Sequence, residues 1–155
     1  MAKRLRRLDE VWIESPIYFV TMCTEQRRRL LANDDAHRVF RAFGEAGVRT
    51  GCAMGNYVLM PDHLHLFVAV APGNGSRGLS NWGKALKALL ARHWSERGIE
   101  GPYWQKSFFD HVIRSSDSMT AKWLYVRENP VRAGLVADAD AWPYAGCIVP
   151  IGFSG

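Results

Sequence analysis

Two histidines stand two positions apart within an apolar run. His63 and His65 flank Leu64, and apolar residues occupy every further even position to Val70. In a β-strand the side chains alternate between the two faces, so both imidazoles would share one face while the apolar series builds core on the other. Neutral imidazole nitrogens are metal ligands near neutral pH. The pair therefore indicates either a metal site on an uncovered sheet face or two exposed or hydrogen-bonded histidines.

A tyrosine with an amide side chain four positions later is a second candidate for chemistry. Tyr125 and Asn129 fall in a predicted helix over about 117–129, where residues four apart share a face. Asn129 would lie in the last turn with its oxygen available to a metal, and Glu128 is another possible oxygen donor. A phenol is a poor nucleophile at its ordinary pKa of about 10. It attacks phosphorus when a divalent cation polarises the phosphate. The spacing alone favours the simpler interpretation, in which Tyr125 packs at the rim.

The surrounding pattern predicts the elements that position these residues. Runs of β-branched and aromatic residues predict strands over 16–24, 56–60, 63–71 and 108–114. Apolar residues at helical spacing predict helices over about 34–49, with Asp34-Asp35 as N-cap, and 79–97, ended by Gly51 and Gly98. Ser115, Ser116 and Asp117 supply caps for the helix that carries Tyr125, and Pro130 is expected to stop it.

The element order is then strand, helix, strand, strand, helix, strand, helix. The strands at 56–60 and 63–71 are too close for a crossover, so they must pair antiparallel. This order predicts an α+β, ferredoxin-like fold, in which helices pack on one face of an antiparallel sheet of about four to five strands. We expect one domain over 1–155, with a basic arm at 1–10 and an irregular tail at 137–155.

The totals fit a soluble globular protein. The chain has 155 residues, of which 48% are hydrophobic and 23% charged, which suffices for one core. No apolar run approaches the ~20 residues of a membrane span, and the basic N-terminus is not a secretory signal, so a cytoplasmic location is expected. The three cysteines, at 23, 52 and 147, lack metal-ligand spacing and are expected to be buried free thiols.

The net charge of +5 comes with clustered cations. Such clusters favour a polyanionic partner, because each neutralised phosphate releases condensed counterions, although a run of charge is more often a solvated face. Trp104 could stack a base, whereas Trp82 and Trp94 are expected in the core. The candidates for phosphate contacts are Arg27, Arg28, Arg29, Lys84, Lys87, Arg92, Arg127 and Arg132.

The segments that hold these residues resemble a known family. Residues 57–66, YVLMPDHLHL, resemble the His-hydrophobe-His signature of HUH-type single-strand nucleases in its transposase form. Residues 104–111, WQKSFFDH, are similar to the segment that follows it in REP-associated tyrosine transposases, which are related to single-tyrosine insertion-sequence transposases. Residues 123–136 resemble that family's nucleophile helix and its exit, and residues 17–21 resemble its first strand. The matches keep the family's order along the chain.

The resemblance implies a function and a role for each matching residue. His63 and His65 would bind Mg²⁺ or Mn²⁺, and Asn129 would be the third ligand. Tyr125 would attack the scissile phosphate, which forms a 5′-phosphotyrosine and frees a 3′-OH; a 3′-OH could later rejoin the strands. The substrate implied is single-stranded DNA with imperfect palindromic hairpins beside a short guide sequence, bound by a monomer or a homodimer.

Two other functions remain open from the residues alone. A ferredoxin-like sheet could bind single-stranded nucleic acid through exposed aromatics without catalysis. A metal-dependent hydrolase of a small phosphodiester would use water as nucleophile and form no protein–DNA adduct. His111 is expected to share a face with Phe109 and Ile113, and to be structural or to support the metal site rather than ligate the metal.

Overall fold

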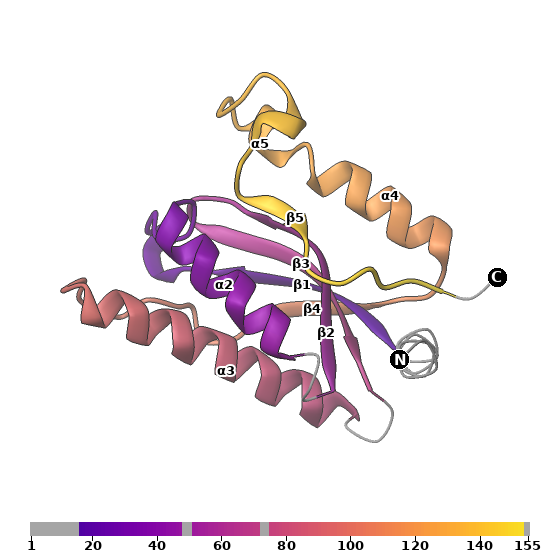
Figure 1. Cartoon of the computed structure of the whole chain (residues 1–155), viewed down its shortest axis with the longest axis horizontal. Helices are drawn as coiled ribbons and strands as arrows, with labels where there is room; N and C mark the ends of the chain where they lie inside the picture. Colours follow the sequence, from indigo (N-terminus) through magenta and orange to yellow (C-terminus); the bar gives the residue numbers. More distant parts are fainter. Residues whose placement is uncertain (1–15, 48–50, 72–74, 154–155) are drawn as a thin grey trace.

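A single antiparallel sheet forms the centre of the computed structural model, which describes residues 16–47, 51–71 and 75–153 (Figure 1). Its strand order is β4-β1-β3-β2-β5. All neighbouring strands pair antiparallel. The strands are β1 (Ile17–Cys23), β2 (Cys52–Leu59), β3 (His63–Val70), β4 (Phe109–Ile113) and β5 (Ala145–Cys147). The helices are α2 (Asp34–Gly47), α3 (Gly75–Glu96), α4 (Ser116–Val126) and α5 (Asn129–Arg132), with short 3₁₀ turns η1 (Glu25–Arg27) and η3 (Ala139–Ala141).

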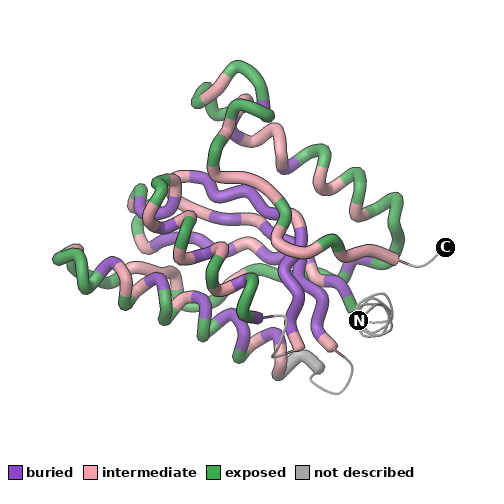
Figure 2. The backbone as a smooth tube through the Cα atoms, viewed as in Figure 1, coloured by how far each residue is buried: buried purple, intermediate pink, exposed green. Residues whose placement is uncertain are grey.

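The helices α2 and α3 cover one face of the sheet, as Figure 1 shows. The even-numbered apolar residues of β3, from Leu64 to Val70, point to this face and join the main core with Phe40 of α2 and Leu86 of α3. Figure 2 shows buried backbone concentrated in the central strands and along parts of α2 and α3, while α4 and α5 are mostly half-buried or exposed. The predicted α+β fold and the alternation along β3 are confirmed.

The opposite face has its own, smaller apolar cluster. Its strand residues include Phe19 and Phe67, and α4 contributes Val126, Met119 and Trp123. The two long helices therefore lie on one face as predicted, but the face that carries the histidines is partly covered by α4 rather than open along its whole length. The result is a sheet between two layers of unequal thickness.

The segment after α4 differs from the predicted single helix. The helix ends at Val126, and a separate turn, α5, begins at Asn129. The Glu128 backbone N–H bonds to the Tyr125 carbonyl, three residues back, so the turn tightens there. Pro130 is not the residue that ends α4. It lies in the first turn of α5, where a backbone N–H has no helical partner and its absence costs nothing. The prediction that Asn129 lies in the last turn of the tyrosine's helix is wrong.

The tail was expected to be irregular, but it contains β5, which pairs with residues 56–58 of β2. Backbone hydrogen bonds hold such a short edge strand, so no side-chain alternation announces it. The strand β2 begins at Cys52 rather than Asn56, because an irregularity in register between Met54 and Tyr57 hides its first half from the pattern.

Other boundaries shift less. Asn33, rather than Asp34 or Asp35, caps α2, since its side-chain oxygen accepts the Ala36 backbone N–H at 2.9 Å. The described part of α2 ends at Gly47; residues 48–50 lie outside the described ranges, and Gly51 instead adopts a left-handed conformation just before β2 (φ +92°). The helix α3 begins at Gly75 instead of Leu79, and β4 is one residue shorter at each end than expected.

Candidate metal and DNA-cleavage site

The two histidines lie side by side at the start of β3. His63 and His65 share the face opposite the main core, and their ring centroids are 4.9 Å apart with the planes at 80°. On the neighbouring strand β1, Cys23 stands opposite His63 and Thr21 stands opposite His65. The predicted pairing of the imidazoles is confirmed, and it follows from strand alternation alone.

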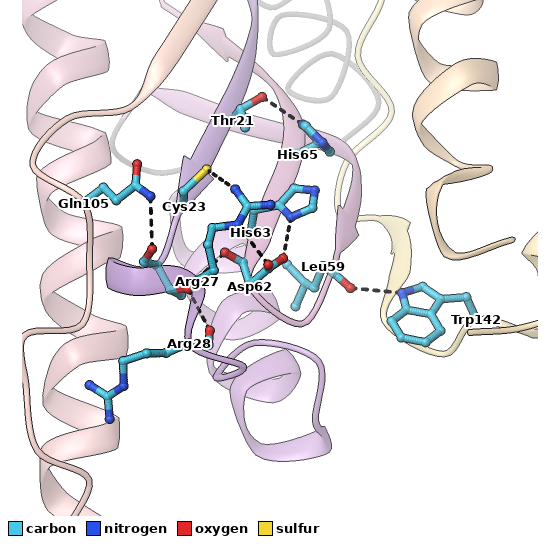
Figure 3. Close-up of polar contacts among 11 residues, drawn as sticks. Thr21, Cys23, Arg27, Arg28, Leu59, Asp62, His63, His65, Gln105 and Trp142 are labelled. Carbon is cyan, nitrogen blue, oxygen red and sulfur yellow. Dashed lines mark hydrogen bonds and ion pairs between the residues drawn. The ribbon is translucent and has the colours of Figure 1, made fainter. Parts of the chain in front are cut away.

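Each imidazole is held through its Nδ1 atom (Figure 3). Nδ1 of His63 lies 2.8 Å from the Asp62 carboxylate, and Nδ1 of His65 lies 2.8 Å from the Thr21 hydroxyl oxygen. Within the described part of the chain, no hydrogen bond engages Nε2 of either ring. If Nδ1–H is the donor in both contacts, each Nε2 carries a lone pair, and a partner on the far nitrogen is what fixes the tautomer of metal-binding histidines.

The surroundings keep His65 neutral. Burial, followed by the nearby charges of His63, Lys122 and Arg27, lowers its pKa to about 3. The pKa of Asp62 is also lowered: burial opposes this, but the hydrogen bond and charge of His63 and the charge of Arg27 outweigh it. Arg27 Nε donates to Asp62 at 2.9 Å, so a cation–carboxylate–imidazole chain orients His63.

The helix α4 reaches this face beside the histidines. The Phe19 ring stacks on His65, with centroids 5.3 Å apart and planes at 17°. Lys122 of α4 places its ammonium 5.1 Å from the centroid of the same Phe19 ring. The helix that carries Tyr125 therefore lies over the histidine-bearing face. The Phe19 ring contacts both His65 and Lys122 of this helix.

Tyr125 and Asn129 are joined by an arginine. The Tyr125 side chain is prominent at the surface, with 65% of the residue exposed. The Arg132 guanidinium lies 4.0 Å from the Tyr125 ring centroid, donates to the Tyr125 carbonyl at 2.7 Å, and also donates to the Asn129 side-chain oxygen. Among the described residues no hydrogen bond or ring contact joins Tyr125 or Asn129 to either histidine, so their roles at the metal stay predictions.

The donor set fits a divalent cation bound by two imidazoles. On one face, neither ring has a hydrogen bond to Nε2 from the described residues, and both rings have the oxygen partner on Nδ1 that orients ligating histidines. Over residues 16–47, 51–71 and 75–153, no third His, Cys, Asp or Glu completes a metal cluster.

The predicted phosphate contacts fall into two groups. Several are used within the protein: Arg28 donates to the carbonyls of Glu100 and Pro102, Lys87 to those of Gln105 and Ser107, Arg92 pairs with Glu96 and Arg127 with Asp140. Arg29 and Lys84 are exposed, and among the described residues neither side chain has a hydrogen bond or an ion pair. Lys84 lines a hollow of about 370 Å³ with Lys87 and Lys106.

The aromatic and cysteine predictions have mixed outcomes. Trp82 and Trp94 are buried in the main core, as expected. Trp104 is half-buried, donates its indole N–H to the Lys87 carbonyl at 3.0 Å, and packs against Trp94, so it is placed to hold α3. All three cysteines are free thiols, and Cys23 and Cys52 are buried, but Cys147 is exposed because it lies on the edge strand β5.

His111 shares a face with Phe109 and Ile113, as predicted, and its exposed ring lies 5.5 Å from Phe19. The sequence interpretation missed Thr21, Asp62 and Lys122. Asp62 directly precedes His63, so its contact with that ring could have been predicted from the sequence. The contact of Thr21 with His65 depends on strand register, and the position of Lys122 depends on where α4 packs.

Comparisons with known proteins identify the family to which this α+β chain belongs. Residues 13–129 match the family described as "Transposase IS200 like". This segment exceeds half of the chain, and the protein therefore belongs to the IS200-like transposase family. None of the described helices is long and apolar enough to span a membrane.

Similar proteins place the chain beside one branch of that family. A REP-associated tyrosine transposase of Escherichia coli (strain K12) is 22% identical over 134 residues, which cover 86% of this chain and 78% of that protein. A Haemophilus influenzae relative with the corresponding description is 22% identical over 139 residues, covering 83% and 78%. The resemblance to REP-associated tyrosine transposases is confirmed.

Solved structures agree on the fold. A REP-associated tyrosine transposase bound to a REP hairpin superposes with a TM-score of 0.70 at 22% identity, covering 93% of this chain and 88% of that chain. A Deinococcus radiodurans protein described as a transposase gives a TM-score of 0.52 at 18% identity, covering 76% and 92%.

Proposed function

We propose that this chain is a metal-dependent endonuclease and strand transferase that acts on single-stranded DNA beside palindromic hairpins. The observation that carries the proposal is the state of the two imidazoles on the face over which α4 lies: both Nδ1 atoms have oxygen partners, and among the described residues neither Nε2 atom has a hydrogen bond. The solved relative bound to a REP hairpin supports a hairpin as the partner.

His63 and His65 would hold Mg²⁺ or Mn²⁺ through Nε2, and Asn129 would supply the third protein ligand. When bound, the cation would supply positive charge that polarises the scissile phosphate. Two imidazoles and an amide oxygen leave coordination positions for phosphate and water. The Asn129 oxygen accepts from Arg132 in this structure, which leaves its second lone pair for a metal.

Tyr125 would be the nucleophile. Its phenolic oxygen loses its proton and bonds to phosphorus, the bond between phosphorus and the 3′ oxygen breaks, and the leaving oxygen takes up a proton to become a 3′-OH. The 5′-phosphotyrosine keeps the energy of the original phosphodiester. A 3′-OH can therefore reverse the step, which rejoins strands without an external energy source.

Adduct formation tests the proposal. The chain is incubated with a single-stranded hairpin library and Mn²⁺, and products are separated on a denaturing gel. We expect a covalent protein–DNA band from the parent chain and none from Tyr125→Phe, while DNA binding by the variant is unchanged. Cleavage without an adduct would instead indicate a hydrolase that uses water, and binding without cleavage would indicate a non-catalytic module. An adduct that survives in Tyr125→Phe would refute the nucleophile assignment.

A further inference from the structure

Phe109 is unusually exposed for a phenylalanine. It is 72% exposed, more than any other large hydrophobic residue of the described ranges; the next are Tyr125 at 65% and Leu124 at 54%. It lies at the beginning of β4, which is an edge strand. A side chain this exposed adds little to the core, so its ring is available to a molecule outside the fold.

The register places Phe109 in one row with the metal site. Phe109 stands directly opposite Thr21 on β1, Thr21 stands opposite His65 on β3, and the Thr21 hydroxyl contacts His65 at 2.8 Å. Alternation along β4 puts Phe109 on the same face as His111 and Ile113, of which Ile113 belongs to the apolar cluster beneath α4. Phe109 therefore projects from the face that carries the histidines.

The covering layer stops short of this row. The cluster shared with α4 contains Ile17 and Ile113 from one row of β1 and β4 and Phe19 from the next, but not Phe109. The row that holds Phe109, Thr21 and His65 is the next one along the strands. An exposed aromatic ring thus borders the imidazole pair where α4 leaves the sheet open.

We propose that Phe109 is a stacking platform for an unpaired nucleobase of the DNA strand, close to the phosphate held at His63 and His65. Two strand spacings separate β4 from β3, roughly 10 Å. At a stacked rise of 3.4 Å, this corresponds to a base within about three nucleotides of that phosphate. Aromatic rings bind single strands in this way because every base has a π-face. That the phosphate is the scissile one rests on the proposed function.

The charges nearby favour a nucleic acid over a protein as occupant. Two cations flank the site that the strand would cross: the Lys122 ammonium lies 5.1 Å from the centroid of the Phe19 ring that stacks on His65, and Arg27 Nε donates at 2.9 Å to the Asp62 carboxylate that contacts His63. On its own face of β4 the neighbours of Phe109 are polar: Thr21 stands opposite it, and the exposed His111 follows two residues later, whereas Phe108 and Val112 alternate to the other face. One ring among polar side chains is too small for a protein interface, whose core needs a contiguous apolar area, but it matches one base.

A comparison of two strands of equal charge tests the inference. Binding of oligodeoxythymidine and of an abasic strand of the same length is measured by fluorescence anisotropy in EDTA. We expect the parent chain to prefer oligodeoxythymidine, and Phe109→Ala to lose roughly 5- to 150-fold on that strand. Affinity for the abasic strand should stay the same, and Phe109→Trp should retain the preference. Leu124→Ala, which truncates another exposed apolar side chain, is the matched control and should change neither affinity.

The outcomes separate this inference from the proposed function. An equal loss on both strands, no loss on either, or a parent chain that does not distinguish the strands would overturn the stacking role. The assay contains no metal and needs neither Tyr125 nor a cut. If adducts fail to form while the base-dependent loss in Phe109→Ala remains, the nuclease proposal fails and the platform stands. If adducts form but binding does not depend on the bases, the platform fails and the nuclease proposal stands.

Discussion

Among the described residues, two histidine–hydroxyl pairs use opposite nitrogens of the imidazole ring. Nδ1 of His65 contacts the Thr21 hydroxyl at 2.8 Å. Nε2 of His37 in α2 lies 2.6 Å from the Tyr57 hydroxyl, which also accepts from Arg41 at 2.7 Å. Since that oxygen accepts from Arg41, its proton is available to donate to His37.

The difference decides what each imidazole can do. The lone pair of His37 is occupied by the Tyr57 hydroxyl, so this ring fastens α2 to β2. When the Thr21 hydroxyl accepts from Nδ1–H of His65, the lone pair of this ring is on Nε2, beside that of His63, and is available to a metal. Burial is the largest cause of a lowered pKa in both His37 and His65. Burial and a neutral ring therefore do not distinguish a metal ligand from a structural histidine. The two rings differ in which nitrogen contacts the hydroxyl group.

Removal of the imidazole rings should separate the proposed metal ligands from the structural His37 most clearly. We expect His65→Ala or His63→Ala to lower cleavage of hairpin DNA by more than about a hundredfold, since loss of a group that merely orients a ligand already costs 10–100-fold. His37→Ala should stay within about threefold of the parent. Mn²⁺ affinity, followed by electron paramagnetic resonance, should fall with the first two variants alone. Equal losses in all three would mean that the pair has no special role.

Removing the carboxylate behind His63 should have a smaller effect. Asp62→Ala leaves the imidazole without the partner that fixes its tautomer, and we expect Mn²⁺ affinity to fall about 10- to 100-fold. Asp35→Ala is the matched control, because this carboxylate also has a lowered pKa and pairs with Arg38 and Arg97. If both variants bind Mn²⁺ like the parent chain, Asp62 does not orient the ligand.

The structural pair should respond in stability rather than activity. Tyr57→Phe removes the buried hydroxyl shared by His37 and Arg41, and we expect urea unfolding to show a loss of about 1 kcal/mol, near the low end for an unmade hydrogen bond because water reaches its half-buried partners. Cleavage should be unchanged. Tyr18→Phe, whose hydroxyl has no hydrogen bond among the described residues, should cost less; a reversed order would contradict the assigned network.

The smallest expected effect is on the pH dependence of stability. Because the folded-state pKa of His37 lies below its ordinary value, its neutral form favours folding above about pH 6.5, and this contribution is lost as the pH falls toward the folded pKa. The free energy of unfolding should therefore decrease between about pH 7 and pH 5 in EDTA. His65 acts in the same direction, so the test is the difference between the parent and His37→Gln, whose curve should be flatter. Parallel curves would contradict it.

Much of the fold could be predicted because its signals are local. The alternation from His63 to Val70 identifies a strand and assigns its two faces without reference to any other segment. The order of elements then forces an antiparallel sheet. β5 could not be predicted in this way, because three residues with a central glycine carry no period. The predicted end of the tyrosine's helix was three residues too late. The prediction used Pro130 as the stop signal, but proline is also tolerated in the first turn of a new helix.

The sequence by itself determined that two imidazoles share a face and that the tyrosine lies on a helix, since both are properties of neighbouring residues. The tertiary structure decided which ring nitrogen is free, because the partner of His65 lies 44 residues away on another strand and depends on register. It also decided that α4 covers only part of the histidine face and leaves Phe109 in the open, because packing between layers is set by whole surfaces rather than by local periodicity.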